Sequence, residues 1–163
     1  MALVTLDDIL EARKRLRGIA VRTPLLPCPW ASDGDRSLVL KPENLQLAGA
    51  FKIRGAYNRM AALSDAERAR GVIAQSSGNH GQALAYAARI LGVKAVVVMP
   101  DTAAPVKIEA TREQGAEVVL VPPEDREKIT SELAGERGSI VVPPFDDPYI
   151  IAGQGTEIGR AHV

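Results

Sequence analysis

Lys41–Ala56, KPENLQLAGAFKIRGA, has the composition of a strand end, a glycine-bearing loop and the start of a helix. Lys52 falls in the first turn of that helix, directly after the aromatic Phe51. An amine at this place lies near backbone N–H groups, and desolvation lowers its pKa, so it can attack an aldehyde. An isolated lysine on an amphipathic helix is more often an exposed surface residue. Both interpretations remain open on this stretch alone.

Segments of strand and helix character alternate after this stretch. Apolar or β-branched runs predict strands at 37–41, 72–75, 94–99, 117–121 and 140–142. Helical patterns predict helices at 52–63, 79–91, 105–114 and 124–133. The runs at 94–99 (KAVVVM) and 117–121 (EVVLV) suit strands that are buried on both faces. The alternation predicts an α/β fold with an open parallel sheet and helices on both faces.

A second informative run, Gln75–Gln82 (QSSGNHGQ), lies where an expected strand meets an expected helix. Ligands of open α/β sheets bind at this edge. Backbone N–H groups at a helix start, together with serine hydroxyls, form an anion site that suits a carboxylate or a phosphate. The alternative is an ordinary helix cap made by Ser76, Ser77 or Asn79. The two roles are compatible, because a cap also orients the loop.

Composition limits the functional classes. The 163 residues suffice for one ordinary domain, and 20 basic side chains balance 20 acidic ones, which argues against nucleic acid or an anionic membrane as partner. Cys28 is the one cysteine, so no internal disulfide or cysteine-based metal cluster is expected. His80 lacks partners for a zinc site or a catalytic triad, and we expect no metal. Neither a signal-peptide pattern nor a membrane-length apolar run occurs, and we expect a cytoplasmic protein.

Near the N-terminus, Thr5 and Asp8 have the spacing of a capping box and predict a helix start.

The pattern K-x-E-x-x-Q-x-x-G-x-F-K-x-R-G-A of Lys41–Ala56, followed by the Ser76–Gly81 run, resembles the pyridoxal-phosphate-dependent threonine/serine dehydratases. These are fold type II enzymes, similar to the tryptophan synthase β subunit, and they include serine racemase. The resemblance covers about Thr5–Thr156 and implies pyridoxal 5'-phosphate as cofactor.

The resemblance also implies roles for single residues. Lys52 would carry the cofactor covalently and later shuttle the α-proton, while Phe51 and Asn79 would contact the cofactor ring. The substrate carboxylate would bind to Ser76, Ser77, Gly78, Asn79 and His80, in part through backbone N–H groups. Ser77 would be a second catalytic residue, since the matching serine acts as acid or base in racemases. Ala48 and Ala50 replace hydroxyl residues frequent in the family, so contacts from those hydroxyls are not expected.

By the same resemblance, residues 1–40 would belong to a large domain, 41–145 would form the small domain, and 146–156 would begin the return to the large domain. The C-terminal half, with the glycine-rich phosphate-binding loop, would be missing. Residues 157–163 (EIGRAHV) would be a non-native tail, since they can be back-translated into sequencing-adapter read-through.

The function implied is an ammonia-lyase that converts L-threonine or L-serine to a 2-oxo acid and ammonia, in threonine catabolism or isoleucine biosynthesis. The intact enzyme would be a homo-oligomer that binds a small amino-acid substrate, with no nucleic acid or membrane as partner. Alternatives are a serine racemase or a dehydratase of another β-hydroxy amino acid. An alternative of another class is an inactive α/β fragment or a half-protein that complements a separate second half.

Overall fold

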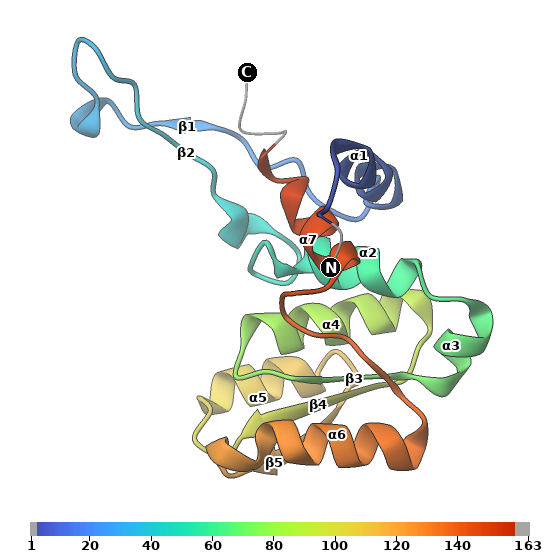
Figure 1. Cartoon of the computed structure of the whole chain (residues 1–163). Coiled ribbons are helices and arrows are strands. Elements are labelled where there is room, and N and C mark those ends of the chain that lie inside the picture. Colours follow the sequence, from blue (N-terminus) through green and yellow to red (C-terminus); the bar gives the residue numbers. More distant parts are fainter. Residues whose placement is uncertain (1–2, 159–163) are drawn as a thin grey trace.

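The structure is a computed structural model that describes residues 3–158 (Figure 1). Its strands are β1 (Leu26–Pro27), β2 (Val39–Leu40), β3 (Val72–Gln75), β4 (Ala95–Pro100), β5 (Glu117–Val121) and β6 (Ile140–Val141). Its α-helices are α1 (Leu6–Arg15), α2 (Lys52–Ala61), α3 (Asp65–Arg70), α4 (Asn79–Leu91), α5 (Pro105–Arg112), α6 (Arg126–Arg137) and α7 (Pro148–Gly155). Short 3-10 turns lie at Pro29–Ala31, Glu43–Leu45 and Pro123–Asp125.

The main sheet has the strand order β5-β4-β3-β6, and its neighbouring strands pair in parallel. The expected α/β fold with an open parallel sheet is therefore confirmed. The expectation that 117–121 is buried on both faces is wrong, because β5 is an edge strand with exposed Glu117 and Leu120. Its β-branched composition predicts a strand, but it does not tell a central strand from an edge strand that one helix half-covers.

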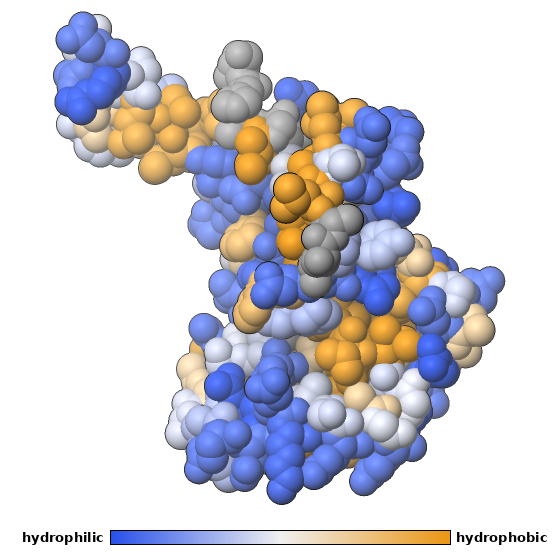
Figure 2. Space-filling view, viewed as in Figure 1, coloured by the Kyte–Doolittle hydropathy of each residue, from blue (hydrophilic) through white to orange (hydrophobic). Residues whose placement is uncertain are grey.

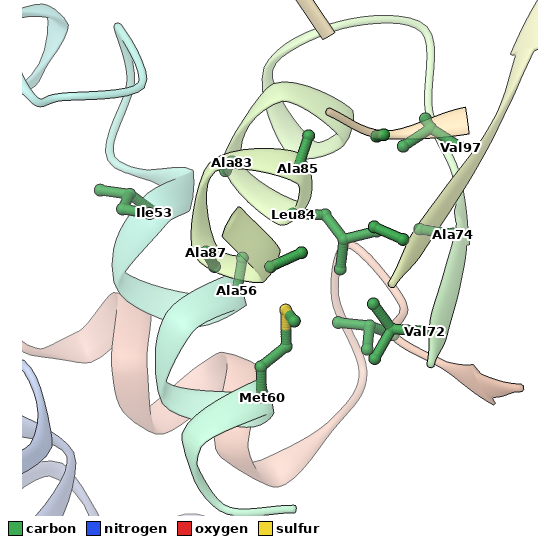
Figure 3. Close-up of a cluster of buried hydrophobic side chains, with 14 of the residues drawn as sticks. Ile53, Ala56, Met60, Val72, Ala74, Ala83, Leu84, Ala85, Ala87 and Val97 are labelled. Atoms are coloured by element: carbon green, nitrogen blue, oxygen red, sulfur yellow. The ribbon is translucent and has the colours of Figure 1, made fainter. Parts of the chain in front are cut away.

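Side chains of the two central strands alternate between the faces, as the pleat requires. Val72, Ala74 and Val97 point toward α4 and α2, where Leu84 and Met60 complete a buried cluster (Figure 3). Helix α6 covers the opposite face of the sheet. Its Ile129, Leu133 and Ala134 pack against a smaller buried cluster that includes Ile73, Val96 and Val98. Helices on both faces thus bury the centre of the sheet.

Helices outside the sheet layers form a stack on one side of the molecule. α2 packs on α4, α7 packs on α2, and α1 contacts α7 (Figure 1). The approach of α7 to α2 is very close, since a Cβ on Gly153 would collide with the Arg54 carbonyl oxygen. Beyond this stack, β1 and β2 pair antiparallel in an arm that extends from the body.

Most expected elements are present within a few residues of their expected bounds. The capping box of Thr5 and Asp8 is confirmed at the start of α1. Helix α3 was not expected, although Ser64 and Glu67 form a capping box at its start. Among residues 3–158, no helix is long and apolar enough to cross a membrane. The expected non-native tail falls largely on 159–163, which lie outside the described residues.

Candidate active site

Lys52 is the first residue of α2 and is only partly exposed. Its Nζ donates a hydrogen bond of 2.8 Å to the carbonyl oxygen of Pro144, in the segment between β6 and α7. The same Nζ lies 5.2 Å from the centroid of the Phe51 ring. Burial lowers the pKa of Lys52 below its ordinary value of 10.5, because desolvation disfavours the ammonium form. More of this lysine is therefore present as nucleophilic amine at neutral pH than of a solvated one.

The pattern that surrounds Lys52 in the sequence forms a buried polar network on the other side of α2. Arg54 makes two hydrogen bonds to the Glu43 carboxylate, of 2.6 and 2.8 Å. Thr23 and Gln46 donate to the same carboxylate, and Arg54 also donates to Thr156 at 3.3 Å. Burial alone would raise the pKa of Glu43, but these hydrogen bonds outweigh it and lower that pKa. The network joins the N-terminal segment, the loop before α2 and the end of α7 to the helix that begins with Lys52.

The loop between β3 and α4 is ordered by one hydroxyl. Ser76 Oγ accepts hydrogen bonds from the backbone N–H groups of Gly78 at 3.2 Å and Gly81 at 2.8 Å. Gly78 occupies the N-cap position and has no side chain that could cap the helix. Ser76, which lies two residues upstream, caps the helix instead. The helix geometry leaves the N–H groups of Asn79 and His80 without acceptors inside α4. These two donors at the positive end of α4 suit a carboxylate.

The side chains of this loop separate into exposed and buried ones. Ser77 and Asn79 are exposed, whereas His80 is 4% exposed and points into the core. Its Nε2 lies 3.0 Å from the Val142 carbonyl oxygen. Burial, opposed by this bond and reinforced by the charge of Lys52, lowers the pKa of His80 to about 4. His80 is therefore neutral at physiological pH. Its backbone N–H, and not its buried side chain, is the group left for the carboxylate-binding role that the family resemblance implies.

An open cleft of about 540 Å³ adjoins these groups at the carboxyl ends of β3 and β6. Ser76 and Ser77 line one side of it, and Arg126 with Glu127 at the start of α6 lines another. Pro144 also lines the cleft, and its carbonyl oxygen binds Lys52. The structure thus brings the lysine and the serine loop, 24 or more residues apart in sequence, to one edge of the sheet.

Four groups near the site were not predicted from the sequence. They are the Pro144 carbonyl, Arg126 and Phe145 at the cleft, and Lys107, whose Nζ lies 2.9 Å from where a Cβ on Gly78 would stand. Short-range patterns carry no signal for them, because they come from segments distant in sequence from Lys52 and the serine loop. Only the packing of α5, α6 and the segment after β6 reveals their position.

The residues present fit the aldehyde end of pyridoxal phosphate. Lys52 offers a desolvated amine next to an aromatic ring, and the amide of Asn79 is exposed at the neighbouring helix start. In the part of the chain that the structure describes, no three His, Cys, Asp or Glu side chains are grouped so as to hold a metal ion. The donor set at this edge therefore suits an organic aldehyde and a carboxylate.

Comparison with known proteins gives a consistent result. The sequence profile of a family described as "Pyridoxal-phosphate dependent enzyme" matches residues 16–159. An L-threo-3-hydroxyaspartate ammonia-lyase of Saccharomyces cerevisiae is 44% identical over 159 residues, which are 96% of this chain and 49% of that protein. An L-threonine ammonia-lyase of Thermotoga maritima is 45% identical over 157 residues, which are 94% of this chain and 39% of that protein.

A solved structure of serine racemase from Dictyostelium discoideum matches 98% of this chain with a TM-score of 0.91 and 41% identity. The match covers 53% of that protein. This chain spans about half the length, or less, of the relatives that it matches. These relatives include lyases and a racemase with different substrates.

Proposed function

The chain belongs to the family of pyridoxal-phosphate-dependent enzymes of fold type II, and we propose that it forms the lysine-bearing half of an ammonia-lyase for L-threonine or L-serine. The observation that carries the proposal is the partly buried Lys52 amine with a lowered pKa, at the sheet edge where the Ser76–Gly81 loop presents its backbone donors. We further propose a cytoplasmic homo-oligomer that acts in threonine catabolism or isoleucine biosynthesis.

The residues of this chain have separate roles in such a reaction. Backbone N–H groups of Asn79 and His80, in the loop that Ser76 orders, bind and orient the substrate carboxylate. Pyridoxal phosphate, when bound through Lys52, supplies the electron sink for the bond that breaks at the α-carbon. The Lys52 amine, with its lowered pKa, accepts the α-proton. The exposed Asn79 side chain would contact the cofactor ring, and Ser77 presents an exposed hydroxyl beside the cleft.

A second candidate substrate has an acidic side chain. Arg126 lines the cleft next to Ser76 and Ser77, and a guanidinium suits the second carboxylate of a substrate such as 3-hydroxyaspartate. Glu127 lines the same cleft and opposes this selectivity. The relative from Saccharomyces cerevisiae is a 3-hydroxyaspartate ammonia-lyase, which supports testing this substrate beside threonine. Serine racemisation remains the other enzymatic alternative, since a serine racemase is among the similar structures.

A non-catalytic function is the alternative of another class. The arm and α7 expose apolar side chains, which include Leu26, Val39, Leu40 and Ile151 (Figure 2). A surface of this kind is typical of a protein interface. In this alternative the chain is an inactive α/β unit or one half of a protein assembled from two chains.

The deciding assay measures 2-oxo acid release from L-threonine, L-serine and L-threo-3-hydroxyaspartate, and D-serine formation from L-serine, with the protein that carries this chain. We expect 2-oxobutanoate from threonine, and a loss of about 10²- to 10⁴-fold in kcat for Lys52→Ala, which removes the proton acceptor. Lys128→Ala, on the exposed face of α6, is the matched control and should retain full activity. Racemisation without 2-oxo acid would favour the racemase, and no turnover with any substrate would favour the non-catalytic alternative.

A further inference from the structure

Four different elements make hydrogen bonds with the short segment Val142–Pro144. Val142 N donates to Ile73 O at 2.9 Å and extends the pairing of β6 with β3. The Val142 carbonyl oxygen lies 3.0 Å from His80 Nε2, on α4. The Pro144 carbonyl oxygen accepts from Lys52 Nζ at 2.8 Å and from Gln154 Nε2, on α7, at 3.4 Å. The acceptor of the Lys52 amine is therefore part of a segment that is held from several sides.

The chemistry of the His80 contact fixes the state of its ring. A carbonyl oxygen can only accept, so Nε2 must carry the hydrogen that it donates to Val142. A neutral imidazole with its proton on Nε2 has a bare Nδ1, and Nδ1 is buried without a hydrogen-bond partner among the described residues. His80 is consequently a fixed donor, and it has no second proton with which to act on a substrate.

The segment itself is stiff. Val142 is fully buried, and the two residues after it are both prolines. Proline fixes φ and has no backbone N–H, so Pro143 and Pro144 have few alternative conformations and no donor of their own. A bond that holds Val142 therefore also restricts where Pro144 and its carbonyl group lie. Loss of that bond would leave the buried Val142 oxygen unpaired, which favours a shift of the segment.

We propose that His80 is a positioning residue that fixes the Pro144 carbonyl as the resting acceptor for the free amine of Lys52. The lysine side chain has four rotatable bonds, and without a fixed acceptor its amine would sample many positions. Pro144 borders the cleft that Ser76 and Ser77 also line, so this acceptor holds the amine against a residue of the cleft wall. The inference rests on the proposed function only in taking Lys52 as the reactive amine, and its test uses no substrate.

The first test measures the pKa of Lys52 by ¹³C NMR titration of the cofactor-free protein. A carbonyl that accepts from the ammonium stabilises the charged form, so loss of the acceptor lowers the pKa. We expect His80→Leu to lower the pKa of Lys52 by about half to one pH unit, which corresponds to one lost hydrogen bond. His80→Gln, whose amide can donate as Nε2 does, should keep the wild-type pKa. Lys128 on the exposed face of α6 is the internal reference and should not change.

A Lys52 pKa that is unchanged or raised in His80→Leu would overturn the inference. A second measurement needs no variant and therefore stands even where His80→Leu does not fold. The imidazole ¹⁵N shifts of the wild-type protein should show a protonated Nε2 and a bare Nδ1 from about pH 5 to 8. A proton on Nδ1 would exclude the bond to Val142 and contradict the inference. Either failure would leave the proposed lyase activity intact, because both readouts are independent of turnover.

Discussion

At the scale of single residues, burial acts on two basic side chains of the site. Desolvation lowers the pKa of Lys52 below its ordinary value and lowers the pKa of His80 to about 4, which leaves His80 neutral at physiological pH. A neutral amine is a nucleophile and a base, whereas a neutral histidine with one fixed proton is a structural donor. Burial thus assigns different roles to two basic side chains that lie close enough for the charge of one to lower the pKa of the other.

The lowered pKa of His80 predicts a pH dependence of stability. The unfolded chain takes up a proton near pH 6.5, whereas the folded chain takes it up only near pH 4. The contribution of neutral His80 to the free energy of unfolding is therefore fully present above about pH 6.5 and is lost as the pH falls toward 4. This contribution is at most about 3 kcal/mol. Urea unfolding between pH 7 and 4 measures it. His80→Gln should flatten this part of the curve, and an equally steep curve in that variant would contradict the assignment.

The sequence predicted the identity of the reactive lysine candidate but not its surroundings. Phe51, Lys52 and the Ser76–Gly81 loop stand out through their spacing and their resemblance to a family. The contact between Lys52 and Pro144 joins residues far apart in the chain, and a backbone carbonyl has no side-chain signature. The burial of His80 was likewise invisible, since its exposed neighbours Ser77 and Asn79 have the same polar character.

At the scale of elements, local sequence patterns predicted the existence and the bounds of most helices and strands well. The bounds expected for β3 and α4 are those observed, because a short apolar run and a helix ending at Gly92 are both unambiguous. Gly92 adopts a positive φ of 65°, which glycine accepts without strain. The position of β5 at the edge of the sheet was not predictable, because strand order is decided by tertiary packing.

The close approach of α7 to α2 gives a prediction with a built-in control. A methyl group at Gly153 would collide with the backbone at Arg54, so Gly153→Ala should destabilise the protein by about 1–3 kcal/mol or prevent folding. Gly135, inside α6, has open space around its Cβ position, and Gly135→Ala should stabilise the helix by about 0.5–1 kcal/mol. Thermal unfolding of both variants checks this. Equal effects of the two substitutions would show that helix propensity alone matters and that α2 and α7 do not pack closely.

At the scale of the whole molecule, the distribution of apolar surface distinguishes the body from the arm. The sheet is covered on both faces, whereas Leu26, Val39 and Leu40 of the arm are each 44–49% exposed (Figure 2). The chain spans about half the length, or less, of its relatives, and we propose that the rest of the intact protein covers this surface.

The exposed arm predicts self-association of the isolated 163-residue chain. Apolar surface that has no partner reduces its contact with water by pairing with another copy. Sedimentation velocity should therefore show concentration-dependent oligomers, and replacing Leu26, Val39 and Leu40 together by serine should shift them toward monomer. Val106→Ser on α5, where the side chain is 73% exposed, is the control and should have no effect. A monomer at every concentration would contradict the prediction.

The central claim is that Lys52 is the amine that binds the cofactor. The direct measurement adds pyridoxal phosphate to the protein, traps the lysine-bound form with borohydride and locates the label by peptide mass spectrometry. We predict that the label is on the peptide containing Lys52, because this lysine combines a lowered pKa with a place beside the cleft and the serine loop. A label spread over surface lysines such as Lys94 and Lys128, with none on Lys52, would contradict the account.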